Sequence, residues 1–254
     1  MTPMTPPPMF GIFHISTVLA GTLLAVFFAK RAAKLPKDRI IRLFGILGLI
    51  MAFSELGKQL FYYYVVNDRQ FDWWIFPFQL CSVPMYLCLL MPLFSGRRRS
   101  KTAEKVQNSF CTFLATYSLF GAVMALLWPE DMLRPFLLMT LHGFLWHLLL
   151  VFLSLTVIFS GLGDFSVCGF LDAVLLFFGL AFIATLINVF GWYHPSLPGS
   201  YPDMFYITPF VMTTQPVVRS VAEAVGIVPA NILYLLSISL FAGLICLAVR
   251  RLCR

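Results

Sequence analysis

Seven apolar runs, each close to the length of a membrane-crossing helix, constrain this sequence of 254 residues more than any other feature. A helix needs about 20 mostly apolar residues to cross a hydrocarbon core of about 30 Å. Only 11% of the residues are charged and 60% are hydrophobic, which excludes a soluble globule because its surface could not be covered. We therefore predict an all-α, polytopic membrane helix bundle of about seven transmembrane helices, forming a single membrane domain over residues 1–254. The runs are approximately Phe10–Ala29, Leu43–Val66, Trp73–Phe94, Phe110–Leu127, Pro135–Phe159, Phe170–Phe190 and Ala230–Leu252.

Basic residues gather in alternate connections between these runs, and this pattern predicts how the chain is oriented. Because basic loops stay on the cytoplasmic side, the expected topology is N-out and C-in. The net charge of +7 is then a topology signal, so we expect no nucleic-acid partner and a multi-pass protein of the cell membrane, in bacteria the cytoplasmic membrane. Fourteen of the 18 basic residues follow the pattern: Lys30, Arg31, Lys34, Lys37, Arg39, Arg42, Arg97, Arg98, Arg99, Lys101, Lys105, Arg250, Arg251 and Arg254.

Two segments lie outside the runs and differ from them in composition. Residues 1–9 are rich in proline and uncharged, which predicts an exposed tail. Residues 192–228 contain five prolines and one short apolar segment, Met204–Met212, that cannot span a bilayer. We expect residues 192–228 to form an irregular outer loop or lid, either interfacial or re-entrant.

The cysteines do not form a pattern that indicates disulfides or metal binding. Five of the six lie in the cytoplasmic half of the expected topology, where reducing conditions oppose disulfides. No Cys or His cluster has the spacing of a metal site, and no glycine-rich phosphate loop is present, so we expect neither a metal nor a cofactor. Gly161 and Gly163 are expected to form a hinge in a loop. Cys81 alone falls in the outer half of the bundle.

Polar residues within the second run share one helical face. Glu55, Lys58, Gln59 and Tyr62 are spaced i, i+3, i+4 and i+7. Glu55 and Lys58 can neutralise each other as a structural ion pair that ties this helix into the bundle. Alternatively, they form a polar wall for a lipid headgroup, or the carboxylate orients a base.

Further polar residues fall at a similar depth on other runs. Gln79 and Cys81 lie just before Pro84, which is expected to kink the third helix. His142 and His147 are about 140° apart on the fifth helix and roughly 10 to 18 Å below its outer end. A histidine in a membrane helix commonly just hydrogen-bonds a neighbouring helix. A cysteine, a histidine and a carboxylate at one depth also fit nucleophilic catalysis, because an imidazole can activate a thiol.

At these residues the chain resembles the YwaF-like family of bacterial integral membrane proteins and their distant eukaryotic relative, transmembrane protein 164. The matching stretches are residues 55–62, Pro77–Cys81, the surroundings of His147, and residues 203–209. The eukaryotic relative moves fatty acyl chains between glycerophospholipids and uses a cysteine and a histidine. The resemblance therefore implies that Cys81 is an acyl-accepting nucleophile and His147 its base. It leaves substrate-binding or supporting roles to Glu55, Lys58, Gln59, Gln79 and His142.

Three functions remain open from the sequence. The first is an intramembrane phospholipid acyltransferase that works without coenzyme A, with membrane lipids as its partners. The second is a transporter, flippase or receptor-like protein that binds a small or lipidic ligand at the same polar site. The third is a structural subunit whose buried polar residues only hold helices together. A homo-oligomer is compatible with all three.

Overall fold

The structure is a computed structural model that describes residues 3–95 and 100–252. Within these ranges the chain is helical and contains no β-strand, which confirms the all-α prediction. The basic residues Arg97, Arg98, Arg99 and Arg254 lie outside the described residues. The α-helices are α1 (Ile12–Ala32), α2 (Lys37–Phe61), α3 (Val83–Leu90), α4 (Lys101–Phe113), α5 (Leu119–Leu127), α6 (Leu137–Ser160), α7 (Val167–Tyr193), α8 (Pro216–Val225) and α9 (Ile227–Leu252).

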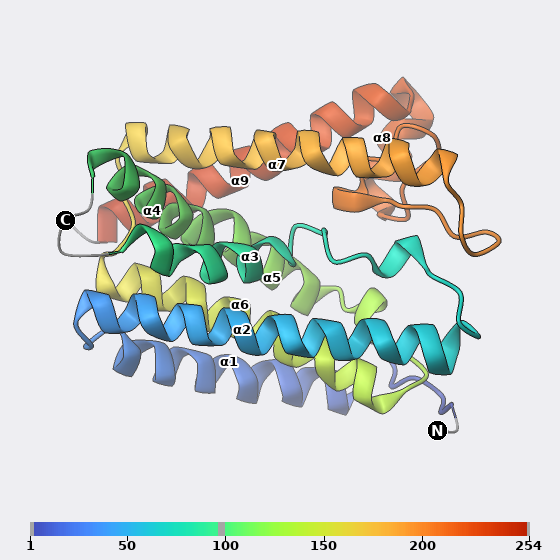
Figure 1. The fold of residues 1–254 in the computed structure, drawn as a ribbon, viewed down its shortest axis with the longest axis horizontal. Coiled ribbons are helices and arrows are strands. Elements are labelled where there is room, and N and C mark those ends of the chain that lie inside the picture. The colour runs from blue at the N-terminus through green and yellow to red at the C-terminus, as the bar shows by residue number, and fades with distance from the viewer. Residues whose placement is uncertain (1–2, 96–99, 253–254) are drawn as a thin grey trace.

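Six helical segments of the described chain are long and apolar enough to cross a membrane. Two of them contain a π-helical turn: Tyr62–Val66 extends α2, and Leu114–Ser118 joins α4 to α5. The long helices lie side by side along the molecule, and the two termini lie at opposite ends (Figure 1). A shorter apolar helical segment, Val83–Phe94, lies within the third of the seven apolar runs.

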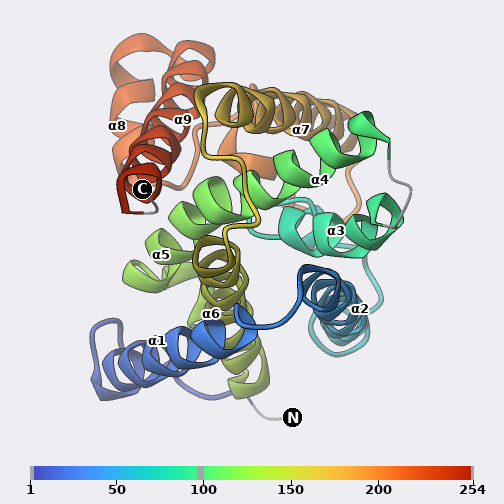
Figure 2. The same cartoon turned by 90° about the vertical axis from the view of Figure 1, so that its left-hand side faces the viewer.

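The centre of the bundle is formed by α6 and by the continuous helix from α4 to α5. More than half of each is buried inside the protein, whereas α1 and α9 are mostly exposed, as helices that face lipid would be. Viewed along the bundle, α1 and α2 lie on one side of this centre and α7, α8 and α9 on the other (Figure 2).

The third apolar run differs from the expected kinked helix. Its first part is irregular apart from one 3₁₀ turn at Trp73–Ile75, and a short apolar helical segment covers only Val83–Phe94. Pro84 lies in the first turn of α3, where its missing N–H costs nothing. Irregular backbone is tolerated at membrane depth only where protein groups satisfy it. Side chains do so here: Tyr86 Oη donates to Pro77 O at 2.8 Å, and Trp146 Nε1 donates to Cys81 O at 2.9 Å.

The two ends of the bundle differ in charge. One end carries the 194–215 loop, and we call it the loop end. The opposite end, which we call the basic end, carries cationic residues in the last turns of α1 and α9. Gly161, with φ of +63°, ends α6 there and starts the turn to α7.

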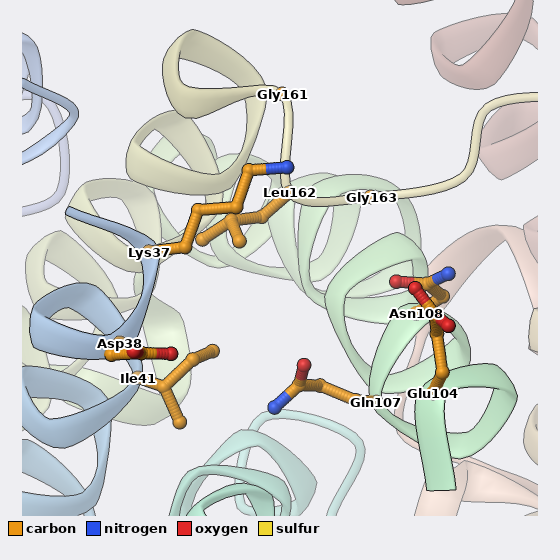
Figure 3. Close-up of a pocket in the computed structure, with 9 residues that line it drawn as sticks. All are labelled: Lys37, Asp38, Ile41, Glu104, Gln107, Asn108, Gly161, Leu162 and Gly163. Carbon is orange, nitrogen blue, oxygen red and sulfur yellow. The ribbon is translucent and has the colours of Figure 1, made fainter. Parts of the chain in front are cut away.

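A small cavity of about 350 Å³ lies at the basic end, between α2, α4 and the connection from α6 to α7 (Figure 3). The Lys37 side chain extends towards the backbone at Gly161 and Leu162 (Figure 3). A cation in this position complements the negative end of the α6 dipole. The candidate site residues lie elsewhere, towards the loop end.

Candidate active site

A larger cavity of about 800 Å³ is enclosed by α2, the 74–82 segment, α5, α6, α8, α9 and the 203–206 turn. It brings together six of the seven residues that the sequence nominated: Glu55, Lys58, Gln79, Cys81, His142 and His147. Residues from three separate parts of the chain thus line one space, as their common depth led us to expect. The seventh, Gln59, lies behind the cavity wall.

The carboxylate of Glu55 is the centre of the polar wall on α2. Its Oε1 lies 2.8 Å from Lys58 Nζ and accepts a hydrogen bond from Gln59 Nε2 at 2.7 Å. Gln59 Nε2 also donates to the carbonyl of Ile75 and so connects α2 to the irregular segment. Buried charges need such partners, because an isolated charge in a protein interior is costly. The pair presents a neutral but strongly polar surface to the cavity.

Cys81 lies two residues before the first residue of α3, on the N-terminal side of the N-cap residue Ser82, and has a free thiol. Its carbonyl accepts the hydrogen bond from Trp146 Nε1, which fixes the irregular segment against α6. This position was not apparent from the sequence, where Cys81 was expected inside a helix.

His147 has a defined tautomer. Its Nδ1 lies 2.7 Å from Gly143 O, and a carbonyl can only accept, so Nδ1 carries the proton. The lone pair is therefore on Nε2, the atom that a general base would use. Because Trp146 is the preceding residue, the bond from Trp146 to the Cys81 carbonyl also holds Cys81 near this part of α6.

His142 also lines the cavity and lies five residues closer to the loop end of α6, about 140° from His147 around the helix. Its ring packs on Trp146 with centroids 5.5 Å apart. Nε2 of His142 is buried and has no hydrogen-bond partner among the residues that the structure describes. A water molecule or a ligand group in the cavity would satisfy this atom, because buried polar atoms are usually hydrogen-bonded.

Residues 203–208, within the segment expected to be an irregular outer loop or lid, form a short, mostly buried segment that we call the plug; residues 216–225 of the same segment are helical and form α8. Its backbone is bound by three amide side chains from distant parts of the chain. Gln79 donates to Asp203 O and accepts from Phe205 N at 2.9 and 2.8 Å, and Asn188 pairs in the same way with both backbone groups of Met204. Asn231 donates to Ile207 O and Thr208 O. Since the amide of Gln79 is occupied by the plug, its geometry supports a structural rather than a substrate-binding role.

The plug holds two residues in a strained backbone conformation. Phe205 and Tyr206 have φ of 59° and 57°, in the left-handed region that costs a bulky residue about 1–3 kcal/mol. The Phe205 ring is stacked between Phe78 and Phe177, and Tyr206 Oη donates to Asp131 Oδ2 at 2.7 Å. Strain of this kind persists only where the surroundings hold the segment, and here it directs Tyr206 to the cavity rim.

The stability of the plug is expected to depend on pH through Asp203. Burial raises the pKa of this carboxyl from 3.8 to about 6, and only the N–H of Thr208 offsets the desolvation. Because the folded pKa is the higher one, the stabilising contribution is complete below pH 3.8 and is lost as the pH rises through 6. We predict that Asp203→Asn, which keeps the acceptor for Thr208, stabilises the protein at pH 7.5 by about 2 kcal/mol relative to wild type. Thermal unfolding in detergent at pH 5 and pH 7.5, followed by tryptophan fluorescence, tests this; an equal pH dependence of both proteins would contradict it.

Sequence reasoning missed several residues that complete the cavity wall. Trp146 and Tyr206 are the clearest cases, because each makes a hydrogen bond that positions a candidate element. Trp146 directly precedes His147, and Tyr206 belongs to the 203–209 stretch quoted for the resemblance, so both could have been found. The cavity wall also contains Arg134, which lies 4.0 Å from Asp131 at the loop end.

Comparison with known proteins gives one finding. The family model described as the TMEM164 family matches residues 9–248, nearly the whole chain. No curated protein and no solved structure matches.

Proposed function

The chain belongs to the TMEM164 family of multi-pass membrane proteins, and from this premise we propose that it is an intramembrane phospholipid acyltransferase with Cys81 as nucleophile and His147 as base. The observation that carries the proposal is the shared cavity. A free thiol two residues before α3 and an imidazole with its Nε2 lone pair available line the same cavity. The resemblance to transmembrane protein 164 supports the same two residues.

The first half of the reaction forms a thioester. His147 Nε2 takes the proton of the Cys81 thiol, and the thiolate attacks the carbonyl carbon of an acyl ester in a glycerophospholipid. The bond between that carbon and the ester oxygen breaks. The oxygen leaves with the proton from His147, which releases a lysophospholipid and leaves the acyl chain on Cys81.

The second half transfers the chain and restores the enzyme. The free hydroxyl of a second lysophospholipid gives its proton to His147 and attacks the thioester carbonyl. The carbon–sulfur bond breaks, and the sulfur recovers the proton as the new ester forms. Donor and acceptor both come from the membrane, so the cycle needs neither coenzyme A nor another cofactor.

The remaining polar residues have supporting tasks in this scheme. Lys58 can meet a lipid phosphate as a point charge while Glu55 keeps the buried site electrically balanced. Gln59 holds Glu55 in place, and Gln79 holds the plug. The plug covers the loop end of the cavity and thereby protects a thioester from water.

The proposal predicts acyl exchange by the purified protein alone. The full chain is reconstituted into phosphatidylcholine vesicles that contain a donor with an isotope-labelled acyl chain and an unlabelled lysophospholipid. We expect labelled chain on the acceptor without added coenzyme A, and a hydroxylamine-sensitive acyl adduct on the peptide that contains Cys81. Mass spectrometry of lipids and peptides measures both, and folded protein that produces neither would overturn the proposal.

The alternative hypothesis, that the protein is a transporter, predicts a different result in the same vesicles. Buried ionisable residues such as Glu55 can carry protons or recognise a headgroup during transport. Solute or lipid translocation that is lost in Glu55→Gln but unchanged in Cys81→Ala would favour transport over acyl transfer. The acyltransferase proposal expects both the adduct and the exchange to depend on Cys81.

A further inference from the structure

The large cavity has two chemically different sides. Nearly all of its nominated polar residues come from α2, the 74–82 segment and α6. The opposite side is formed by α5, α8 and α9, and its wall is almost entirely apolar. The contribution of α9 is one continuous helical face consisting of Ala230, Leu233, Tyr234, Ser237, Ile238 and Phe241.

The apolar side is open while the polar side is closed. Glu55 and His147 are only 4% and 8% exposed. On the other side Met124, Leu233 and Phe241 line the cavity and yet are 48%, 49% and 48% exposed. About half of each of these side chains is thus left uncovered by other protein groups, so the cavity wall is loosely packed along α5 and α9. Because α5 and α9 belong to segments long enough to cross a membrane, this open side faces hydrocarbon.

Access from the loop end is only partly obstructed by the structure. The hydrogen bond from Tyr206 to Asp131 connects the plug to the 130–134 turn across the cavity rim, but this bond is itself exposed. The plug is held by Gln79, Asn188 and Asn231 through backbone hydrogen bonds. The open side between α5 and the α8–α9 pair is the route that a ligand dissolved in the bilayer would take.

The dimensions of the apolar wall indicate what fits there. The α9 face from Ala230 to Phe241 is about 16 Å long at about 1.5 Å per residue. One leaflet contributes half of a hydrocarbon core of about 30 Å, so a single acyl chain has about this length. The rings of Phe120 and Phe241 stack with centroids 5.2 Å apart and form one boundary of the wall.

We propose that the α5–α8–α9 wall binds one acyl chain of a membrane phospholipid that enters sideways from the bilayer, and that Gly121 is the passage from this wall to Cys81. A Cβ at Gly121 would have only the Leu80 side chain within 4 Å, at 3.8 Å, so the position is open. Leu80 directly precedes Cys81, and Gly121, Leu80 and Cys81 all line the same cavity. The assignment of the passage rests on the function proposed above, whereas binding of the chain does not.

A matched pair of glycine substitutions tests this inference. Gly121→Leu places a branched side chain in the passage. Gly179→Leu makes the same change on α7, outside the cavity, where a Cβ meets nothing within 4 Å. Both replace a helical glycine by a better helix former, so neither is expected to unfold the protein. The probe is a phosphatidylcholine with a diazirine in one acyl chain, present at trace level in phosphatidylcholine vesicles.

We expect ultraviolet light to label the cavity faces of α5 and α9 in wild type and in Gly179→Leu. In Gly121→Leu, labelling at these positions is expected to fall about tenfold, which the loss of two methylene contacts suffices to produce. Acyl exchange is expected to fall with it. Equal labelling of the cavity faces in all three proteins, or label confined to lipid-facing positions, would overturn the inference. Repeating the labelling in Cys81→Ala separates the two proposals: retained labelling without catalysis supports chain binding alone, whatever becomes of the chemistry.

Discussion

Cys81→Ala is expected to lose acyl exchange by about 10³-fold or more, because Cys81 is the only cysteine that lines the cavity in the part of the chain that the structure describes. The thioester on the Cys81 peptide is expected to disappear completely. The change removes one sulfur atom and leaves the Cys81 carbonyl free to accept from Trp146, so the irregular segment keeps its anchor. Initial rates of labelled-chain transfer in vesicles, measured at equal amounts of folded protein, give the comparison.

The chain contains a suitable control for this substitution. Cys168 is a free, exposed cysteine at the start of α7, at the basic end and away from the cavity. Cys168→Ala is expected to exchange acyl chains at the wild-type rate and to retain the adduct on Cys81. If Cys81→Ala also kept the wild-type rate, Cys81 would not be the nucleophile, even though it lines the cavity.

The long helices were predictable because an apolar run of about 20 residues has few structural solutions in a bilayer. The runs beginning at Phe10 and ending at Leu252 correspond to α1 and α9 with shifts of a few residues. Composition alone determined this part of the fold. The observed helix boundaries differ from the ends of the apolar runs because basic residues are good helix formers. Lys37 and Arg39, for example, lie outside the apolar run and yet belong to α2.

The third run was less predictable for a physical reason. Residues 73–82 are as apolar as a helix, but their backbone groups bind side chains that lie far away in the sequence. Trp146 binds the Cys81 carbonyl, and Gln79 binds the plug more than 120 residues later. Such partners decide whether irregular backbone is stable in a membrane, and no local pattern reveals them.

The candidate site was predicted in part. Depth along the helices placed Glu55, Cys81 and His147 in one layer, and they do line one cavity. The depth of a residue does not reveal whether its side chain also binds the plug. Only the structure shows that the amide groups of Gln79 and Asn188 hydrogen-bond to the plug backbone. The apolar wall at α5, α8 and α9 could not be foreseen either, since its residues look like any lipid-facing surface.

His147→Ala is expected to reduce acyl exchange by about 10²- to 10⁴-fold, the usual contribution of a general base. His147→Ala removes the Nε2 lone pair, and it also removes the packing of the ring and the hydrogen bond from Nδ1 to Gly143 O. A second variant must therefore separate the loss of the base from the loss of these contacts. His147→Gln provides that control. Its amide N–H can donate to the same carbonyl, but it has no basic nitrogen.

The two variants separate proton transfer from positioning. If His147 is the base, the variants His147→Gln and His147→Ala lose acyl exchange to a similar extent. The alkylation of Cys81 by N-ethylmaleimide is then slower in both variants, because less thiolate forms. If His147 only holds α6 and the 79–82 segment together, Gln recovers most of the exchange and Cys81 alkylates at the wild-type rate. The alkylation reads out the thiol directly and is independent of lipid binding. A Gln variant with wild-type exchange would therefore exclude His147 as the base while leaving Cys81 as the nucleophile.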